Sequence, residues 1–319
     1  MTSHALITGG AGFIGSHLAE RLLADGARVT IIDDLSTGTR ANLAAVANHP
    51  RLRFIAAKLS ACAELGQIAA EADQIFHLAA AVGVELVVRS PTRVIETNLH
   101  ETEVLFEAAA ANRTPVLLAS TSEVYGKSTK HEFTEEDDLL IGPPTHARWS
   151  YACSKLMDEF LALAFAKERQ VPVIIARLFN TVGPRQTGRY GMVLPRFITA
   201  AKTNAPLQVY GDGQQTRCFC YVNDTVEALV RLARCPAAPG QIFNVGNTEE
   251  ISIGALANQV IASLNSTSPV QCIPYNEAYE PGFEDMRRRK PSLAKLTQFI
   301  GFRPGTPLRE IIQRTAAAG

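Results

Sequence analysis

Short apolar runs alternate with segments of helical periodicity through the first half of the chain. Buried strands are predicted at about 5–7, 27–32, 52–57, 74–79 and 115–120. Helices are predicted between them at about 16–24, 63–71, 92–111 and 150–168. Alternating strands and helices of this kind form βαβ units, so we predict a Rossmann-type α/β fold with a doubly wound parallel sheet.

The second half of the chain is predicted to form a smaller α/β part. Further strands are expected at 173–177 and 241–246, with a helix to Leu264 that begins after Ser252 and a closing helix at 308–317. We divide the chain into 1–175 and 176–319. Because no repeat, low-complexity tract or free linker separates the two parts, we expect them to interleave.

Composition excludes several classes of partner. The 319 residues are 46% hydrophobic, which is enough for a large core, and 31 Lys and Arg balance 31 Asp and Glu. Without a net positive field, we expect neither nucleic acid nor an anionic membrane as a partner. The start of the chain has no signal-peptide pattern, and no apolar run approaches the ~20 residues of a membrane span, so a cytoplasmic protein is expected.

Six scattered cysteines offer no metal site. They stand at 62, 153, 218, 220, 235 and 272, and only Cys218 and Cys220 are close in sequence. A zinc site would need a second pair, so we predict no metal and reduced cysteines.

A glycine-rich turn follows the first strand. Gly9, Gly12 and Gly15 form a G-x-x-G-x-x-G pattern between the strand at 5–7 and the helix after Ser16. Residues without Cβ let backbone amides approach a pyrophosphate, which the helix N-terminus then faces. The second strand ends in Asp33, about 20 residues later, where a carboxylate can bind the ribose diol of NAD and repel the 2′-phosphate of NADP. NAD is therefore the predicted cofactor.

A tyrosine and a lysine open the helix predicted at 150–168. Tyr151 and Lys155 are four residues apart, so both side chains lie on one helix face. A phenol with a pKa of ~10 needs a shift of about 3 units, or ~4 kcal/mol, to act as a base at neutral pH. The lysine ammonium and the positive ring of an oxidised nicotinamide can supply that shift.

Several motifs, taken in order, resemble one known family. They are Thr8–Gly15, His77–Ala80, Asn98, Ala119–Gly126 and Tyr151-x-x-x-Lys155. Together they resemble the extended short-chain dehydrogenase/reductases that act on nucleotide sugars. The resemblance assigns 1–175 to NAD binding and implies a cofactor site made of Gly9, Gly12, Phe13, Ile14, Gly15, Asp33, Leu59, Leu78, Ala79, Ala80, Asn98, Tyr151 and Lys155. Lys58 departs from the pattern, because the family usually has an acid near the adenine there.

By the same resemblance, 176–319 binds the nucleotide sugar. The segment Leu178–Arg185 resembles the family's diphosphate-binding segment, and Leu207–Arg217 resembles its uridine and phosphate loop. The implied substrate-binding residues are Arg148, Asn180, Arg189, Tyr210, Arg217 and Arg289. In relatives the helices corresponding to 92–111 and 150–168 form a four-helix dimer interface, so a homodimer is expected; an intramolecular core face is the alternative.

The neighbours of Thr121 distinguish the reactions of this family. A 4,6-dehydratase carries Thr-Asp-Glu, whereas this chain has Thr121-Ser122-Glu123, as UDP-glucuronate decarboxylases do. Those enzymes, including the decarboxylase domain of the bifunctional enzyme that modifies lipid A, also place an arginine where Arg148 stands. The segment Tyr279–Ser292 resembles their Asp-x-x-x-Arg-Lys-Pro segment. The implied catalytic residues are Thr121, Ser122, Glu123, Tyr151, Lys155 and Arg289.

The resemblance implies oxidation of the sugar at C4 followed by loss of CO2. Tyr151 would remove the C4 hydroxyl proton, and the resulting ketone is β to the C6 carboxylate of a glucuronate, which is then lost readily. Hydride return would give UDP-xylose, and early release would give the 4-keto pentose. A UDP-hexose or UDP-glucuronate 4-epimerase and a non-catalytic NAD-sensing protein remain as alternatives.

Overall fold

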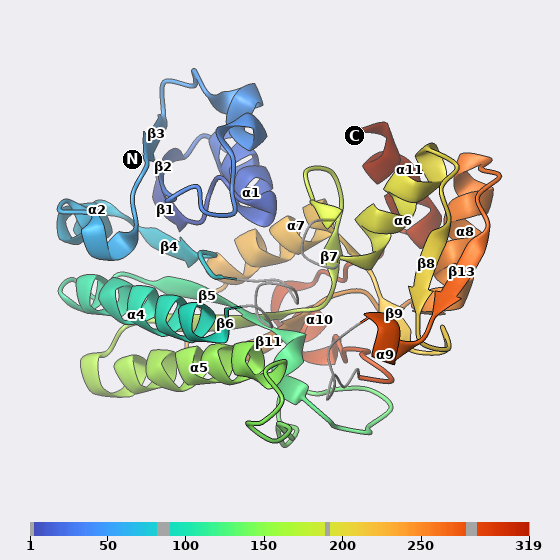
Figure 1. The fold of residues 1–319 in the computed structure, drawn as a ribbon. Coiled ribbons are helices and arrows are strands. Elements are labelled where there is room, and N and C mark those ends of the chain that lie inside the picture. Colours follow the sequence, from blue (N-terminus) through green and yellow to red (C-terminus); the bar gives the residue numbers. More distant parts are fainter. Residues whose placement is uncertain (1–2, 82–89, 189–191, 279–285, 319) are drawn as a thin grey trace.

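The fold is that of a computed structural model, which describes residues 3–81, 90–188, 192–278 and 286–318 (Figure 1). Its centre is a seven-stranded sheet in which every neighbouring pair is parallel. In spatial order the strands are β11 (Gln241–Val245), β6 (Val173–Leu178), β5 (Val116–Thr121), β4 (Gln74–His77), β1 (His4–Thr8), β2 (Arg28–Ile32) and β3 (Leu52–Ile55). The order diverges between β1 and β4, which confirms the doubly wound Rossmann-type fold.

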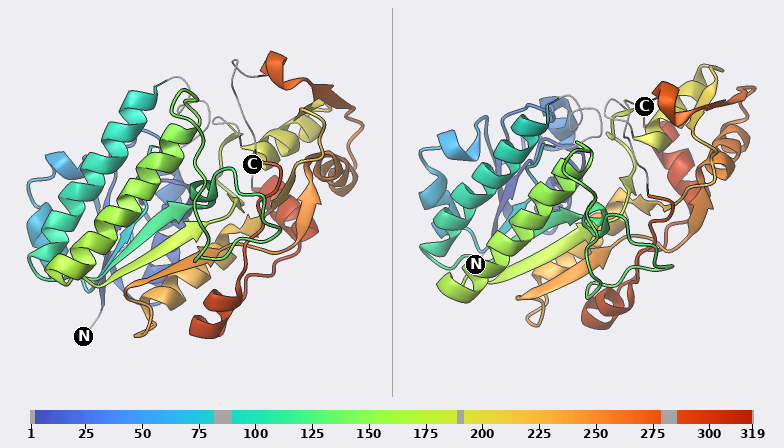
Figure 2. Two further views of the ribbon diagram at one scale, coloured as in Figure 1. Left: turned by 90° about the horizontal axis from the view of Figure 1, so that it is seen from below. Right: turned by 60° about the horizontal axis from the view of Figure 1, so that its bottom comes forward.

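Helices cover both faces of this sheet. One face is packed by α1 (Phe13–Ala24), α7 (Val222–Ala233) and α10 (Ala294–Ile300), and the other by α2 (Leu65–Glu71), α4 (Pro91–Ala110) and α5 (Trp149–Arg169). The helices α4 and α5 run side by side on the outside (Figure 2). Among the described residues, 3₁₀ helices include η1 (Arg40–Val46) between β2 and β3, η2 (Leu59–Ala61) after β3 and η3 (Ser122–Tyr125) after β5. Apolar side chains on both faces give the sheet two separate cores.

A second lobe packs around its own core. The apolar faces of α6 (Val193–Lys202), α8 (Ile253–Leu264) and α11 (Leu308–Ala317) meet through Phe197, Leu256 and Ile311. Ser252 caps α8, as predicted, because its hydroxyl accepts from the amide of Ala255 at 3.2 Å. The remaining elements are α9 (Tyr275–Ala278) and the pairs β8 (Leu207–Tyr210) with β13 (Val270–Ile273), β7 (Thr181–Val182) with β10 (Cys220–Tyr221), and β9 (Thr216–Cys218) with β12 (Glu250–Ser252).

The segment 207–217, which resembles the family's uridine and phosphate loop, is a turn between two strands. Only its centre turns, at Gly211 and Gly213, which have φ of 76° and 70°. The flanks are strands because Leu207 and Val209 alternate with exposed or half-exposed residues and are buried in the second core.

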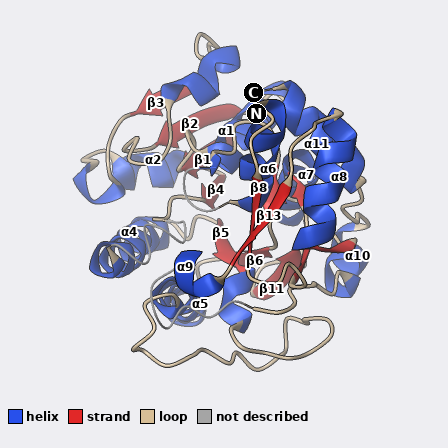
Figure 3. Cartoon of the chain, turned by 45° about the vertical axis from the view of Figure 1, so that its right-hand side comes forward, coloured by secondary structure: helices blue, strands red, loops and turns tan. Residues whose placement is uncertain are grey.

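The chain passes between the two lobes repeatedly. It leaves the sheet after β6, builds part of the second lobe and returns to the sheet through α7 and β11 (Figure 3). It then forms α8 in the second lobe, α10 on the sheet and α11 in the second lobe again. The predicted division between 175 and 176 falls inside β6.

A buried ion pair fixes α5 against the sheet. The guanidinium of Arg177 on β6 lies 2.7 Å from the Glu159 carboxylate, and both side chains are 3% exposed. Ser120 on β5 also donates to Glu159, at 2.5 Å. Breaking such a pair typically costs about 3–5 kcal/mol because the remaining charge stays buried. This anchor sets the position of the helix that carries Tyr151 and Lys155.

Within the described ranges, no helix has the length and apolarity needed to cross a membrane.

Candidate active site

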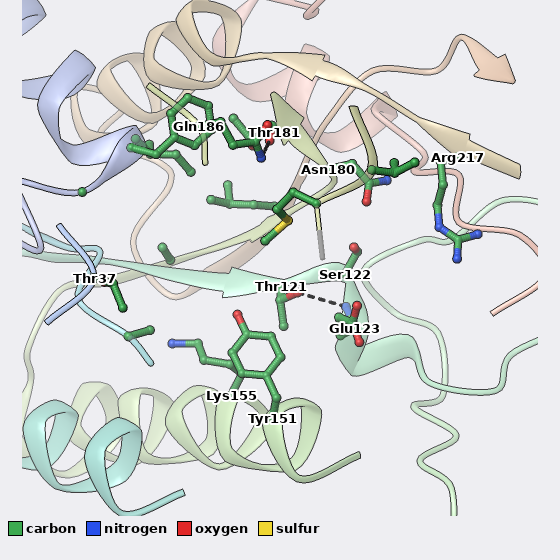
Figure 4. Close-up of a pocket in the computed structure, with 18 of the residues that line it drawn as sticks. Thr37, Thr121, Ser122, Glu123, Tyr151, Lys155, Asn180, Thr181, Gln186 and Arg217 are labelled. Atoms are coloured by element: carbon green, nitrogen blue, oxygen red, sulfur yellow. Dashed lines mark hydrogen bonds between the residues drawn. The ribbon is translucent and has the colours of Figure 1, made fainter. Parts of the chain in front are cut away.

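A cavity of about 440 Å³ lies at the carboxyl edge of the sheet, between the two lobes (Figure 4). The ends of β1, β4, β5 and β6 meet there, next to the point where the strand order diverges. Ligands of doubly wound folds bind at this position. The size is that of a site for an organic ligand.

The glycine turn can exist only with glycines at its two ends. Gly9 has φ of 71°, and a Cβ on it would lie 2.7 Å from the backbone nitrogen of Ala79. A Cβ on Gly15 would lie 2.3 Å from the Gly9 carbonyl oxygen. The close packing brings the N-terminus of α1 to the cavity, where Gly12, Phe13 and Ile14 line the wall. These backbone amides fit the pyrophosphate of a dinucleotide.

Asp33 connects this turn to the end of β2. Its carboxylate oxygens accept from the amides of Ala11 and Leu35, each at 2.8 Å. Burial raises the pKa of Asp33, although the two amides oppose that shift. Asp33 also lines the cavity, together with Leu78, Ala79 and Ala80 from the end of β4. The ribose contact itself stays a prediction.

Thr121 and Tyr151 meet at the end of β5. Thr121 is the N-cap of η3, where its hydroxyl accepts from the Glu123 amide at 3.2 Å, and it shares a hydrogen bond with the Tyr151 hydroxyl. Tyr151 rises from α5 towards Thr121, and Lys155 lies beside its ring (Figure 4). Burial, followed by the Glu123 carboxylate, raises the pKa of Tyr151. The protein alone therefore favours the protonated form of Tyr151, and the lowered pKa that base action requires, which the sequence argument assigned to Lys155 together with the nicotinamide ring, stays a prediction.

Glu123 lies between two arginines from distant segments. Its carboxylate is 2.6 Å from the Arg289 guanidinium and 3.4 Å from that of Arg148. Burial alone would raise the pKa of Glu123, but Arg148 and Arg289 outweigh it and lower the pKa to about 2. Arg289 also donates to the Asn180 side chain at 3.0 Å. Among these three residues the two guanidinium groups outnumber the one carboxylate, so positive charge exceeds negative charge at this point of the wall. We call these three residues the Glu123 clamp.

Two further predicted substrate residues, Tyr210 and Arg217, belong to the second lobe and line the cavity from that side. Arg217 is buried and donates to the carbonyl oxygens of Thr216 and Met286, at 2.7 and 2.8 Å. The guanidinium of Arg196 stacks 4.4 Å above the ring of Tyr210. Arg217, Tyr210 and Ser122 all line the cavity, whereas Arg189 lies outside the described residues.

Two predicted cofactor residues do not line the cavity. Leu59 is buried in the core beneath α2 and α4. Asn98 accepts from the Ala81 amide at 2.7 Å and donates to the Ser154 hydroxyl at 3.1 Å, so it supports the segment after β4. Their contacts with NAD stay predictions. Lys58 is exposed at the start of η2.

Sequence reasoning also missed part of the wall. Thr37, Gln186, Met192, Arg196, Gln215 and Tyr275 line the cavity without having been singled out. Gln215 lies within the 207–217 segment and could have been selected from it. The others come from irregular segments and helix starts, where no periodicity marks the residues that face a ligand.

Comparison of the sequence with known protein families identifies the enzyme class to which this fold and site belong. Residues 5–246 match the model of the NAD dependent epimerase/dehydratase family, so the chain belongs to that family. The family and the solved NAD complexes of its members make NAD the cofactor. The glycine turn and Asp33 fit it.

Within the family, the chain is similar to decarboxylases. It is 40% identical to UDP-N-acetyl-alpha-D-glucosaminuronate decarboxylase of Bacillus cytotoxicus, over 99% of this chain and 97% of that protein. It is 35% identical to UDP-glucuronic acid decarboxylase 1 of Xenopus tropicalis, over 97% of this chain and 70% of that protein. A solved UDP-glucuronic acid 4-epimerase from Bacillus cereus, bound to UDP-glucuronic acid and NAD, has a TM-score of 0.88 at 25% identity and covers 99% of this chain and 98% of its own. The chain is an NAD-dependent enzyme of this decarboxylase and epimerase group.

Replacing Asp33 by Asn should weaken NAD binding and reduce the ratio of the Kd for NADP to the Kd for NAD. Hydrogen bonds to a charged group contribute about 1.5–3 kcal/mol, so we expect the Kd for NAD to rise about tenfold to a hundredfold. Calorimetric titration with both cofactors measures this. Asp34→Asn is the matched control, because the exposed Asp34 carboxylate caps only its own turn, at Ser36. An unchanged Kd in Asp33→Asn would place the ribose elsewhere.

Proposed function

We propose that the enzyme is a UDP-glucuronate-type decarboxylase, which oxidises C4 of a UDP-linked uronate and then releases CO2. The Glu123 clamp carries the proposal. Its two guanidinium groups beside one carboxylate suit a C6 carboxylate better than the hydroxymethyl group of a hexose, which carries no charge. The clamp lies beside Thr121 and Tyr151, close enough for Glu123 and Arg289 to influence the pKa of Tyr151.

The chemistry needs few protein groups. Bound NAD supplies the acceptor for the C4 hydride. Tyr151 takes the hydroxyl proton while Thr121 holds the same oxygen, which gives a ketone β to the carboxylate. When the C5–C6 bond breaks, its electrons pass into the C4 carbonyl, and the developing oxyanion is stabilised by Tyr151 and Thr121. Proton uptake at C5 and return of the hydride would then give the UDP-pentose, UDP-xylose from UDP-glucuronate.

The clamp residues have different tasks in this scheme. Arg289 and Arg148 orient the carboxylate so that the breaking bond aligns with the carbonyl π system. Glu123, with a pKa of about 2, remains ionised and is a weak base at neutral pH. We therefore assign Glu123 to holding the two guanidinium groups, and the proton at C5 to a water or to Tyr151.

The product of a UDP-sugar panel tests this function. Enzyme and NAD are incubated separately with UDP-glucuronate, UDP-N-acetylglucosaminuronate, UDP-glucose and UDP-N-acetylglucosamine, and product mass is measured. A loss of 44 mass units, the mass of CO2, from a uronate is expected. Both uronates are included because the relatives act on sugars with different C2 substituents, and the 40% identical one is named for the N-acetyl sugar. Epimerisation without loss of mass would instead support the 4-epimerase alternative, which the Bacillus cereus neighbour represents.

We also propose a homodimer formed through α4 and α5. Phe160 on α5 is 61% exposed, and Met157 on α5 and Ile95 on α4 are exposed as well. Phe160→Glu should therefore give a monomer in size-exclusion chromatography with light scattering. Val270→Glu changes a partly exposed apolar residue in the second lobe and should leave a dimer. A dimer that survives Phe160→Glu would contradict this interface.

A further inference from the structure

A buried carboxylate beside the catalytic lysine has no part in the mechanism above. Asp158 follows Lys155 by three residues on α5, so the two side chains share the buried face. The Lys155 ammonium lies 2.8 Å from the Asp158 carboxylate, and the two side chains are 2% and 0% exposed. The Lys155–Asp158 pair is not needed to anchor α5 to the sheet, because the Glu159–Arg177 pair already does so.

Among the described residues, Lys155 is the cation that contacts Asp158. From α4 the Thr102 side chain lies near the Asp158 carboxyl group and favours its ionised form, and from β4 the ring of His77 lies 3.0 Å from Thr102. Burial, together with Lys155, lowers the pKa of His77 to about 3, so this ring is neutral. On α5 itself the nearest acid, Glu159, is paired with Arg177.

A chain of hydrogen bonds leads towards this carboxylate. The Ala79 amide donates to the Thr8 hydroxyl at 3.2 Å, and Thr8 lies 2.7 Å from Nδ1 of His77. If Thr8 donates to Nδ1, then Nε2–H of His77 donates to Thr102, and the Thr102 hydroxyl proton can turn towards Asp158. Oδ2 of Asp158 accepts from Lys155, and Oδ1 has no hydrogen-bond partner among the described residues.

We propose that Asp158 is a positioning residue, which holds the Lys155 ammonium in place and sets the pH range over which Tyr151 and Lys155 act. The proposal rests on the proposed function only in that this pair catalyses oxidation at C4. A lysine has three donors, so one can stay on Asp158 while the others face Tyr151 and the cofactor. The negative charge of Asp158 also opposes the loss of a proton by Tyr151.

The direction of the effect follows from charge alone. The Asp158 carboxylate favours the protonated form of Tyr151. Other charges also act on Tyr151: Glu123 from η3 favours the protonated form, and Arg289 opposes it. Asp158→Asn removes a nearby negative charge without changing the shape of the side chain. The pKa of Tyr151 should therefore fall by about one unit.

Two measurements on the full-length enzyme test the proposal. The first is ultraviolet titration of the tyrosinate band in NAD-loaded enzyme, with Tyr151→Phe subtracted to isolate Tyr151. The second is the single-turnover rate of NADH formation between pH 5 and 10, with whichever UDP-sugar reduces the cofactor. For Asp158→Asn we expect the tyrosinate pKa and the acid limb to move down by about one pH unit, and the plateau rate to fall about tenfold because Nζ is less well placed.

The controls separate positioning from a structural role. Asp158→Glu keeps the charge and should retain the wild-type acid limb, while Glu103→Gln removes an exposed carboxylate from α4 and should change neither measurement. If Asp158→Asn does not fold, Asp158→Ser provides the uncharged variant. An unmoved tyrosinate pKa, with or without a lower rate, would overturn the proposal. If no UDP-sugar reduces NAD, the proposed function fails, but the ultraviolet titration still decides the role of Asp158.

Discussion

Tyr151→Phe should abolish reduction of NAD by the sugar substrate. The phenol is the group that takes the C4 hydroxyl proton, and general base catalysis contributes about 10²–10⁴-fold, so a loss of that size is expected. Lys155→Ala should cause a similar loss, because the positive charge that favours the phenolate is removed. Stopped-flow absorbance at the NADH band measures the reduction.

Binding distinguishes this loss from a damaged site. Calorimetric Kd values for NAD and UDP should stay within a few fold of wild type in Tyr151→Phe, because the ring remains in place. In the NAD complex the wild-type rate should also rise with pH through the neutral range, because Lys155 and the nicotinamide ring must offset the burial and the Glu123 charge that raise the pKa of Tyr151, and the base form increases with pH. A Tyr151→Phe rate within a few fold of wild type would remove this residue as the base.

Arg289→Ala should separate oxidation from loss of CO2. In a single turnover with the uronate substrate, enzyme-bound NADH should form within about tenfold of the wild-type rate, while release of labelled CO2 slows by about 10²–10³-fold. The variant lacks the charge-assisted contact that aligns the carboxylate for loss of CO2. Removing one such donor typically lowers the rate of the step by about 10²–10³-fold. Glu123→Gln should act in the same direction, because the amide no longer holds the two guanidinium groups.

A lysine at position 289 provides the matched control. Arg289→Lys keeps the charge but loses the fork that contacts Glu123 and Asn180 together, so its CO2 rate should lie between those of wild type and Arg289→Ala. Equal slowing of NADH formation and CO2 release in Arg289→Ala would assign the residue to binding before oxidation. Unchanged rates would remove the Glu123 clamp from the reaction.

Periodicity predicted the sheet well and the second lobe poorly. The strands of the sheet are continuous buried runs such as Val173–Leu178, which a window of the sequence detects. In contrast, β7 and β10 are two residues long and exist because each pairs with a partner about 40 residues away. No local pattern encodes such a pairing.

The site shows the same limit. The glycine turn and Tyr151 with Lys155 are local motifs, and the sequence alone located them. The contact between Glu123 and Arg289 joins residues 166 positions apart, and only the folded chain brings them together. The burial of Asp158 was also not predicted, because nothing in the sequence marks which acid on a mixed helix face is enclosed by α4.

The repeated passage of the chain between the lobes limits how this enzyme can be recombined with its relatives. A single crossover near residue 175 would split β6 and combine one parent's sheet with the other parent's β11, α7 and α10. Exchange of substrate preference therefore requires cassettes: one between β6 and α7, a second between β11 and α10, and α11 as a third. Chimeras built in this way keep the native sheet intact, and the same interleaving prevents either lobe from being produced as one continuous fragment.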